Sequence, residues 1–166
     1  MANKVVHQSG KTARAYWGPG DRYLFLVTGE ESGGSYFTME VEVPPGAGPP
    51  RHIHHRNEEQ FYILEGAVTI LAGEQTINAV KGDLVHVPRG TVHSFQNPGR
   101  APARMLVTYS PAGIEKLFEQ AFAPDEGEQS TPSLSPEEMI ARFQALEAEY
   151  GMETFWSDIP GFTEEP

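Results

Sequence analysis

Apolar and polar residues alternate along much of the chain between residues 23 and 109. From position 37 to position 43 every second residue is apolar, and the residues between them are Thr or Glu. This two-residue period is typical of a β-strand that buries one face. Similar short runs, many of them bounded by Gly or Pro, predict further strands over residues 60–64, 67–71, 84–87, 92–96 and 104–109. Closely spaced strands without helical crossovers favour an all-β antiparallel sandwich or barrel.

The period changes after Pro111, where apolar residues begin to recur at helical spacing. This pattern predicts an amphipathic helix whose apolar stripe packs across the outside or the mouth of the barrel. The stripe consists of Ile114, Leu117, Phe118, Ala121 and Phe122. A second helix is indicated by Ser135, Pro136 and Glu138, which form the pattern of a helix N-terminus. Gly151 predicts that this helix ends near position 150.

These patterns divide the chain into two parts. We expect residues 1–110 to form the β-barrel with its N-terminal strands, and residues 111–166 to form a helical extension packed on it rather than an independent domain. The C-terminal tail is too aromatic for a free end and should pack on its own barrel or on a partner subunit; its large apolar residues are Phe155, Trp156, Ile159 and Phe162. A homodimer is expected, because the N-terminal strands and this tail could cover open barrel edges.

The composition fits one domain and narrows the set of partners. A chain of 166 residues is about one domain in length. With 23 acidic against 12 basic residues, the net charge of -11 opposes binding to nucleic acid or to an anionic membrane, so we expect a small-molecule partner instead. The chain has no cysteine, so any metal must be held by imidazole and oxygen. Residues 1–17 lack the apolar run of a signal peptide or membrane span, which favours a cytoplasmic location.

Candidate metal ligands occur where three of the six histidines stand together, in His52-Ile53-His54-His55. If this segment is a strand, His52 and His54 lie on the same face, about 6.6 Å apart at roughly 3.3 Å per residue, and can converge on one ion. Glu59 opens the next predicted strand and, at the two-residue period of a strand, lies on the same face as the apolar residues at positions 61 and 63. Because a carboxylate in an inward-facing apolar row is costly to bury unless it is paired or bound to a metal, Glu59 is a candidate third ligand.

A fourth candidate is His93, which shares parity with Phe95 in a later strand. An inward-facing polar side chain at this position is explained more simply if it meets the other three candidate ligands than if it is alone. A single histidine on a strand is more often a hydrogen-bonded core or surface residue than a ligand. We favour that interpretation for His7, His55 and His86.

Two glycine-bounded motifs enclose the candidate ligands. The first has the form G-x5-H-x-H-x4-E-x6-G and runs from Gly46 to Gly66. The second has the form G-x5-P-x-G-x2-H-x3-N and runs from Gly82 to Asn97. Every defined position is present, and the chain therefore resembles the cupin superfamily, in particular small single-domain cupins similar to quercetin dioxygenases. The resemblance implies an all-β double-stranded β-helix (jelly-roll) barrel that holds a metal through His52, His54, Glu59 and His93.

The expected chemistry depends on this donor set. Three imidazoles and one carboxylate suit one divalent ion of Fe, Mn, Ni, Co, Cu or Zn, and the ligand types alone do not choose among them. Four protein ligands around an octahedral ion leave two positions for a substrate. The resemblance to quercetin dioxygenases implies that Glu59 also acts as a general base. An apolar wall should favour a small, partly hydrophobic oxygenated ligand, and it is expected to draw on Phe37, Met39, Phe61, Phe95 and Met105 or Tyr109.

The sequence leaves three functions open. The first is a metal-dependent oxidoreductase of the dioxygenase type. The second is a metal-dependent isomerase, epimerase or decarboxylase, which a pocket lined with Arg, Lys and His would favour. Arg51, Arg56 and Arg89 are the candidates for such a lining, although each is expected at the surface. The third is a ligand-binding cupin without turnover, which is favoured less because the chain shows no recognisable helix-turn-helix.

Overall fold

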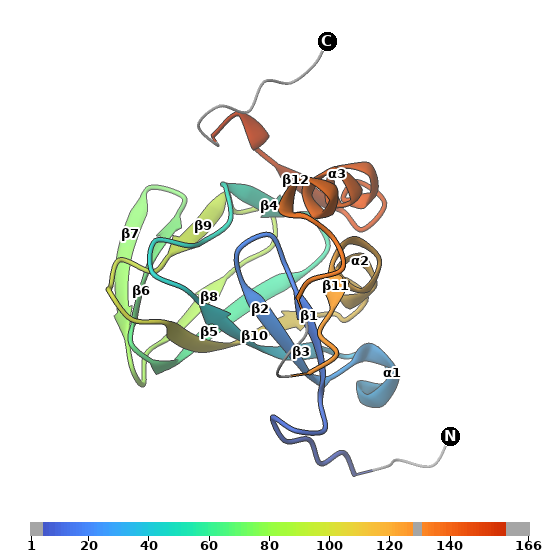
Figure 1. Ribbon diagram of the computed structural model, residues 1–166. Coiled ribbons are helices and arrows are strands. Elements are labelled where there is room, and N and C mark those ends of the chain that lie inside the picture. The colour runs from blue at the N-terminus through green and yellow to red at the C-terminus, as the bar shows by residue number, and fades with distance from the viewer. Residues whose placement is uncertain (1–4, 128–130, 159–166) are drawn as a thin grey trace.

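The computed structural model describes residues 5–127 and 131–158, which form two antiparallel β-sheets that face each other (Figure 1). The first sheet has the order β11-β1-β2-β3-β10-β5-β8. Its strands are β11 (Ala123–Pro124), β1 (Arg14–Trp17), β2 (Arg22–Val27), β3 (Phe37–Val43), β10 (Ala103–Ser110), β5 (Glu58–Glu65) and β8 (Leu84–Val87). The second sheet has the order β12-β4-β9-β6-β7. Its strands are β12 (Met152–Thr154), β4 (His52–His54), β9 (His93–Gln96), β6 (Ala67–Ala72) and β7 (Gln75–Val80).

The strands predicted from the two-residue period are all present, with ends that differ by at most two residues. The expected closed barrel is not observed. Within the described part of the chain each sheet keeps its own hydrogen-bond ladder, so the fold is a two-sheet jelly roll. Strand β7 was not predicted, because Ala79 is its only buried residue and its alternation is weak. The short helix α1 (Gly29–Ser32) was not predicted either.

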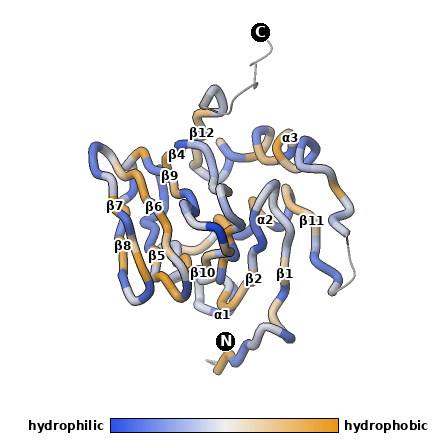
Figure 2. The backbone as a smooth tube through the Cα atoms, turned by 60° about the vertical axis from the view of Figure 1, so that its left-hand side comes forward, coloured by the Kyte–Doolittle hydropathy of each residue, from blue (hydrophilic) through white to orange (hydrophobic). Residues whose placement is uncertain are grey.

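The core lies between the two sheets. Buried and less buried residues alternate along β3 and β10, and Figure 2 shows hydrophobic and hydrophilic segments following one another along the strands. Both sheets contribute large apolar side chains that are fully buried; among them are Phe37, Phe61, Ile63, Ile70 and Met105. Each such side chain stabilises the fold by about 1.5–3 kcal/mol relative to full exposure.

Two helices follow the last long strand. The first, α2 (Glu115–Ala121), forms where the apolar stripe predicts a helix and buries part of that stripe. The second, α3 (Pro136–Leu146), begins with the predicted capping box, in which the backbone N–H of Glu138 donates to Oγ of Ser135. It ends four residues earlier than expected, because residues 147–150 continue as turns and Gly151, at φ +69°, leads the chain into β12.

The segment after β10 also supplies an edge strand to each sheet. Strand β11 pairs with β1 and strand β12 pairs with β4, so both of these edges are covered. Trp156 in the 3-10 helix η1 (Trp156–Asp158) packs edge-on against Phe143 of α3, with ring centroids 6.0 Å apart. The tail therefore packs on its own chain at Trp156, whereas Ile159 and Phe162 lie outside the described residues. None of the helices in the described ranges is long and apolar enough to cross a bilayer.

Candidate metal centre and ligand pocket

A tight backbone crossing places β4 beside β9. The loop that precedes β4 runs across β9, where Gly48 has φ +155° and a methyl group at its Cα would collide with the carbonyl oxygen of Phe95. Asn97 pairs its backbone with this loop, and its Nδ2 donates to the carbonyls of Val43 and Ala101 at 2.8 Å. The loop and Asn97 together fix the pairing of β4 with β9, in which His52 lies opposite His93.

The four candidate ligands meet in the interior. His52 and His54 point inward from β4, His93 comes from β9 of the same sheet, and Glu59 reaches them from β5 of the other sheet. Oε2 of Glu59 lies 2.7 Å from Nε2 of His93 and 3.1 Å from Nε2 of His54. One ligand atom from each of the four residues lies within 4.8 Å of the others, and all four side chains are buried. We call these four residues the donor group.

Backbone carbonyls orient two of the imidazoles. Nδ1 of His52 lies 2.9 Å from the carbonyl oxygen of Pro50, and Nδ1 of His93 lies 2.9 Å from that of Thr91. Because a carbonyl oxygen only accepts, both Nδ1 atoms carry a proton, so Nε2 is the atom of each ring that can bind a metal. For His93 this requires the loss of the proton that Nε2 shares with Oε2 of Glu59 at 2.7 Å. Neither ring nitrogen of the buried His54 has a hydrogen-bond partner.

The donor group combines a neutral imidazole, an ionised carboxylate and an imidazole paired with that carboxylate. Burial, followed by the neighbouring His93 and His54, lowers the pKa of His52 to about 3, so this ring is neutral. Burial alone would raise the pKa of Glu59, but His54 and His93 outweigh it and hold that pKa well below its usual value. Burial likewise opposes the charged form of His93, yet the hydrogen bond and charge of Glu59 raise the pKa of His93.

These observations fit a divalent transition metal. Imidazole nitrogens that have given up their proton and an ionised carboxylate make a set of ligands that such ions accept. Nε2 of His54 lies 3.1 Å from Glu59 but forms no hydrogen bond, which costs free energy in the interior, and a bound cation would satisfy this nitrogen. The four side chains predicted as ligands are therefore brought together in an arrangement that could hold one ion.

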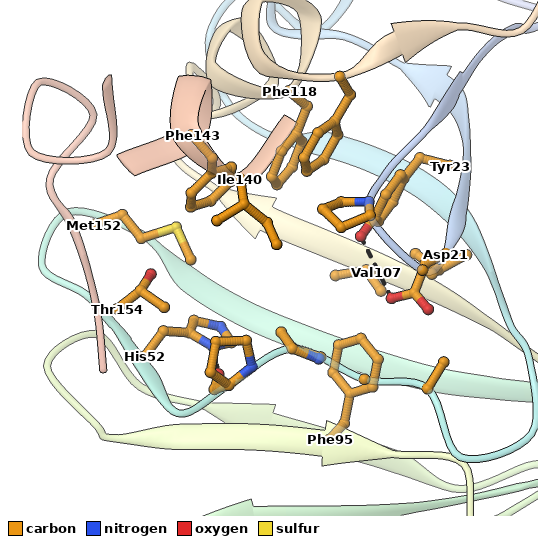
Figure 3. Close-up of a pocket in the computed structure, with 18 of the residues that line it drawn as sticks. Asp21, Tyr23, His52, Phe95, Val107, Phe118, Ile140, Phe143, Met152 and Thr154 are labelled. Carbon is orange, nitrogen blue, oxygen red and sulfur yellow. Dashed lines mark hydrogen bonds between the residues drawn. The ribbon is translucent and has the colours of Figure 1, made fainter. Parts of the chain in front are cut away.

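A cavity of about 240 Å³ opens directly against His52 and Glu59 (Figure 3). Its wall is mainly apolar and draws on both sheets and on the C-terminal helices. Met39 and Phe95, both predicted for the pocket, line it, as does Tyr109. Phe37, Phe61 and Met105 lie instead in the fully buried core and are not among the lining residues.

The far wall of this cavity was not predicted from the sequence. Part of that wall comes from the C-terminal segments; it includes Phe118, Phe122, Ile140, Phe143, Met152, Thr154 and Trp156. The helical stripe indicated that Phe118 and Phe122 face the sheets, but no spacing connected them to the donor group. Asp21 and Tyr23 also line the cavity and were missed, because Asp21 lies in a Gly- and Pro-rich turn that fits no motif.

The remaining candidates lie at the surface. His7, His55 and His86 are exposed, and Nε2 of His55 lies 3.0 Å from Glu153. Arg51, Arg56 and Arg89 are exposed as well, and no Arg or Lys is among the described residues that line the cavity.

Comparison with known proteins now identifies the family. The family model described as "Cupin domain" matches residues 39–109, which include the donor group. The quercetin 2,3-dioxygenase of Bacillus subtilis is 32% identical over 117 residues, which cover 66% of this chain and 34% of that protein. The chain is a member of the cupin superfamily. This cupin thus spans about a third of the length of that relative.

Solved structures agree with this assignment. KdgF from Halomonas sp. superposes with a TM-score of 0.60 over 68% of this cupin and 98% of its own chain, at 16% identity, which shows a shared fold. The cupin domain of Schizosaccharomyces pombe Cnp3 gives a TM-score of 0.57 at 26% identity, over 68% of this cupin and 79% of its own chain. The segments that lie outside the family match include α2, α3 and β12, which build the far wall of the cavity.

Proposed function

We propose that this cupin holds one divalent transition-metal ion through His52, His54, Glu59 and His93, and that it is a dioxygenase-type oxidoreductase acting on a small, partly hydrophobic oxygenated compound. The observation that carries the proposal is the opening of an apolar cavity directly onto His52 and Glu59 of the donor group. When bound, such an ion would supply a Lewis acid and open coordination positions for substrate and dioxygen.

The cavity wall supports an uncharged, partly aromatic ligand. Aromatic rings from several elements face the cavity; they include Tyr23, Phe95, Tyr109, Phe118 and Phe143. No Arg or Lys is among the described lining residues, so a phosphate or carboxylate of a substrate would find no cationic side chain there. Part of the chain is also 32% identical to a quercetin 2,3-dioxygenase, whose substrate class fits a wall of this kind.

Two side chains beside the cavity support a role in handling a substrate proton. Glu59 is held ionised by its imidazole neighbours and lines the cavity, so it can accept the proton of a substrate hydroxyl. Burial, and then the charge of Glu59, raise the pKa of Tyr109 well above its usual value, so the hydroxyl of Tyr109 stays protonated. We assign Glu59 the role of general base, and Tyr109, whose hydroxyl interacts with Glu59, that of a group that orients this carboxylate.

The isomerase and decarboxylase alternatives gain no support from the cavity. A pocket lined with Arg, Lys and His would favour chemistry on sugar phosphates or on acids, and the three arginines considered for this role are exposed. Ligand binding without turnover is the remaining alternative, and an activity assay separates it from the proposal.

Oxygen uptake tests the proposed reaction. Protein loaded with Fe(II), Mn(II), Co(II), Ni(II) or Cu(II), with the metal content measured, is incubated with a flavonol, a 1,3-diketone or a catechol. We expect uptake of dioxygen with at least one of these compounds and incorporation of oxygen into the product. Binding of the compounds without oxygen uptake by metal-loaded protein would contradict an oxygenase and support a binding protein.

A matched pair of histidine variants completes this test. His93→Ala removes a buried ligand and should abolish oxygen uptake, whereas His86→Ala removes an exposed histidine from the neighbouring strand β8 and should leave it unchanged. Equal activity of the two variants would show that the donor group is not the reaction site.

A further inference from the structure

The cavity contains a second polar position, away from the donor group. Asp21 closes the turn between β1 and β2, where its carbonyl oxygen accepts the backbone N–H of Gly18 at 2.9 Å. Its side chain turns inward and is only 6% exposed. Figure 3 shows Asp21 and Tyr23 on the opposite side of the cavity from His52. The cavity therefore has a polar group at each of two separated sides and an apolar wall between them.

The carboxyl group of Asp21 is incompletely satisfied. Its Oδ2 accepts one long hydrogen bond, 3.4 Å, from the hydroxyl of Tyr23, and its Oδ1 is buried without a partner. Glu115, another buried carboxyl outside the donor group, accepts the backbone N–H groups of Gly29 at 2.8 Å and Gly113 at 2.6 Å. Glu115 thus has a structural role in joining loops, whereas Asp21, which lines the cavity, keeps one carboxyl oxygen without a hydrogen bond.

The partner of Asp21 is held rigidly. The ring of Tyr23 stacks on Phe122 at 5.2 Å and on Phe118 at 5.8 Å. Gly18 makes room for this ring, since a methyl group at its Cα would collide with it. The hydroxyl of Tyr23 is therefore fixed beside the carboxyl group, and the two oxygen-bearing groups form a preorganised pair.

The protonation of Asp21 suits a hydroxyl partner. Burial raises its pKa to about 7, and the hydrogen bond from Tyr23 lowers it only in part. Near neutral pH the group can therefore donate as an acid or accept as a carboxylate. A hydroxyl group can complement both forms, because it donates and accepts, whereas a ligand carboxylate would complement only the acid.

We propose that Asp21 and Tyr23 form a second recognition point of the cavity and bind a hydroxyl group of the ligand at the side opposite the donor group. The ligand class is a neutral molecule with an aromatic middle, a metal-binding oxygen pair at one end and a hydroxyl at the other. The inference rests on the cavity being the ligand site of the proposed function, but it does not rest on oxygen chemistry. Asp21 thereby selects ligands that carry this hydroxyl and orients them in the cavity.

Two flavones that differ at one end test this assignment. 3-Hydroxyflavone and 3,4′-dihydroxyflavone share the same 3-hydroxy-4-keto group for the metal, and only the second carries a distal hydroxyl. Their affinities for the metal-loaded full chain are measured by fluorescence titration under nitrogen. We expect the wild type to bind the dihydroxy compound about 5- to 20-fold more tightly, the range of one hydrogen bond to a buried polar group.

Variants then locate the preference. Asp21→Leu should abolish it, Asp21→Asn should keep part of it, and Tyr23→Phe should reduce it two- to threefold. Glu74→Gln, which alters an exposed acid, is the matched control and should change nothing. Metal content should be the same in all of these proteins, because none of the changes touches the donor group.

The outcomes separate this inference from the proposed function. A hydroxyl preference that persists in Asp21→Leu, or a wild type that binds both flavones equally or neither, overturns the inference. A preference that is lost in Asp21→Leu, in protein that consumes no oxygen, supports the inference and contradicts the oxygenase. Oxygen uptake together with an unchanged preference in Asp21→Leu supports the oxygenase and overturns the inference.

Discussion

The two polar sides of the cavity are built in different ways. The donor group stands on three strands, and backbone carbonyls at 2.9 Å fix the rings of His52 and His93. Asp21 stands in a turn, has one hydrogen bond of 3.4 Å, and faces a wall formed by segments a hundred residues further along the chain. The side of the cavity with the donor group, which we call the donor side, is thus fixed by strand pairing. The opposite side, with Asp21 and the far wall, which we call the ligand side, is fixed by long-range packing. We infer that metal binding and ligand selection can be altered separately.

The largest expected effect lies on the donor side. In His93→Ala, Glu59 loses the partner at 2.7 Å and only three ligands remain, so metal affinity should drop more than about 100-fold, beyond the loss typical of residues that only orient ligands. Competition with a chelator of known affinity measures it, with His86→Ala as the surface control. An affinity within about threefold of the wild type would remove His93 from the ligand set.

The next effect concerns the far wall. Phe143 is buried and packs against Phe118, Phe122 and Trp156, so Phe143→Ala should lower the free energy of unfolding by about 3–5 kcal/mol. Denaturant unfolding measures the change, and Tyr62→Ala, at a side chain that is 41% exposed, should cost less than about 1 kcal/mol. Folded Phe143→Ala should retain its metal. Loss of metal at full stability would contradict the separation of the two sides.

A glycine pair tests how the donor strand β4 is positioned. Gly48→Ala combines a positive φ with a collision against the backbone of β9 and should cost about 3 kcal/mol or more, together with weaker metal binding. Gly73→Ala also has a positive φ but meets no atom within 4 Å, so it should cost about 1 kcal/mol and leave the metal in place. Equal effects of both variants on metal affinity would show that the crossing at Gly48 does not position His52.

The smallest effect is the pH dependence of Asp21. Because its pKa is about 7 in the folded protein and near 3.8 in an unfolded chain, the folded state binds more protons in this window, and the stability contributed by the group falls as pH rises through it. Relative to the wild type, Asp21→Asn should therefore gain stability between pH 5 and pH 8, by about 1–3 kcal/mol. Groups present in both proteins, such as His93, cancel in this difference. Denaturant unfolding across the range measures it, and a difference independent of pH would contradict the raised pKa.

The donor side could be predicted because the spacing of residues within single strands determines which way its side chains point. The spacing of His52 and His54 puts both on one face of a strand, and the parity of Glu59 and His93 directs both inward. Alternation located β3, β5, β6, β8, β9 and β10 for the same reason. It did not locate β7, where a single inward residue is buried, and it gave no bounds for β1, β2, β11 and β12. Gly151 was assigned to the end of α3, but the backbone N–H of Met152 bonds to Glu147, and Gly151 serves a turn into β12.

The ligand side could not be predicted in the same way. Alternation shows that Phe37, Met39 and Phe61 point inward, but it does not show that only Met39 of these three borders the cavity. That distinction depends on where α2 and α3 pack, and therefore on contacts between residues far apart in sequence. No local sequence pattern marks Asp21, because its proposed role depends on the cavity that it lines.

Anomalous diffraction from a crystal grown with Mn(II) or Co(II) tests the central claim most directly. We expect one strong peak in the interior, bonded to Nε2 of His52, His54 and His93 and to a carboxylate oxygen of Glu59, at distances near 2.0–2.3 Å. A peak at another place, or none in protein that contains the metal, would contradict the donor group and the function built on it.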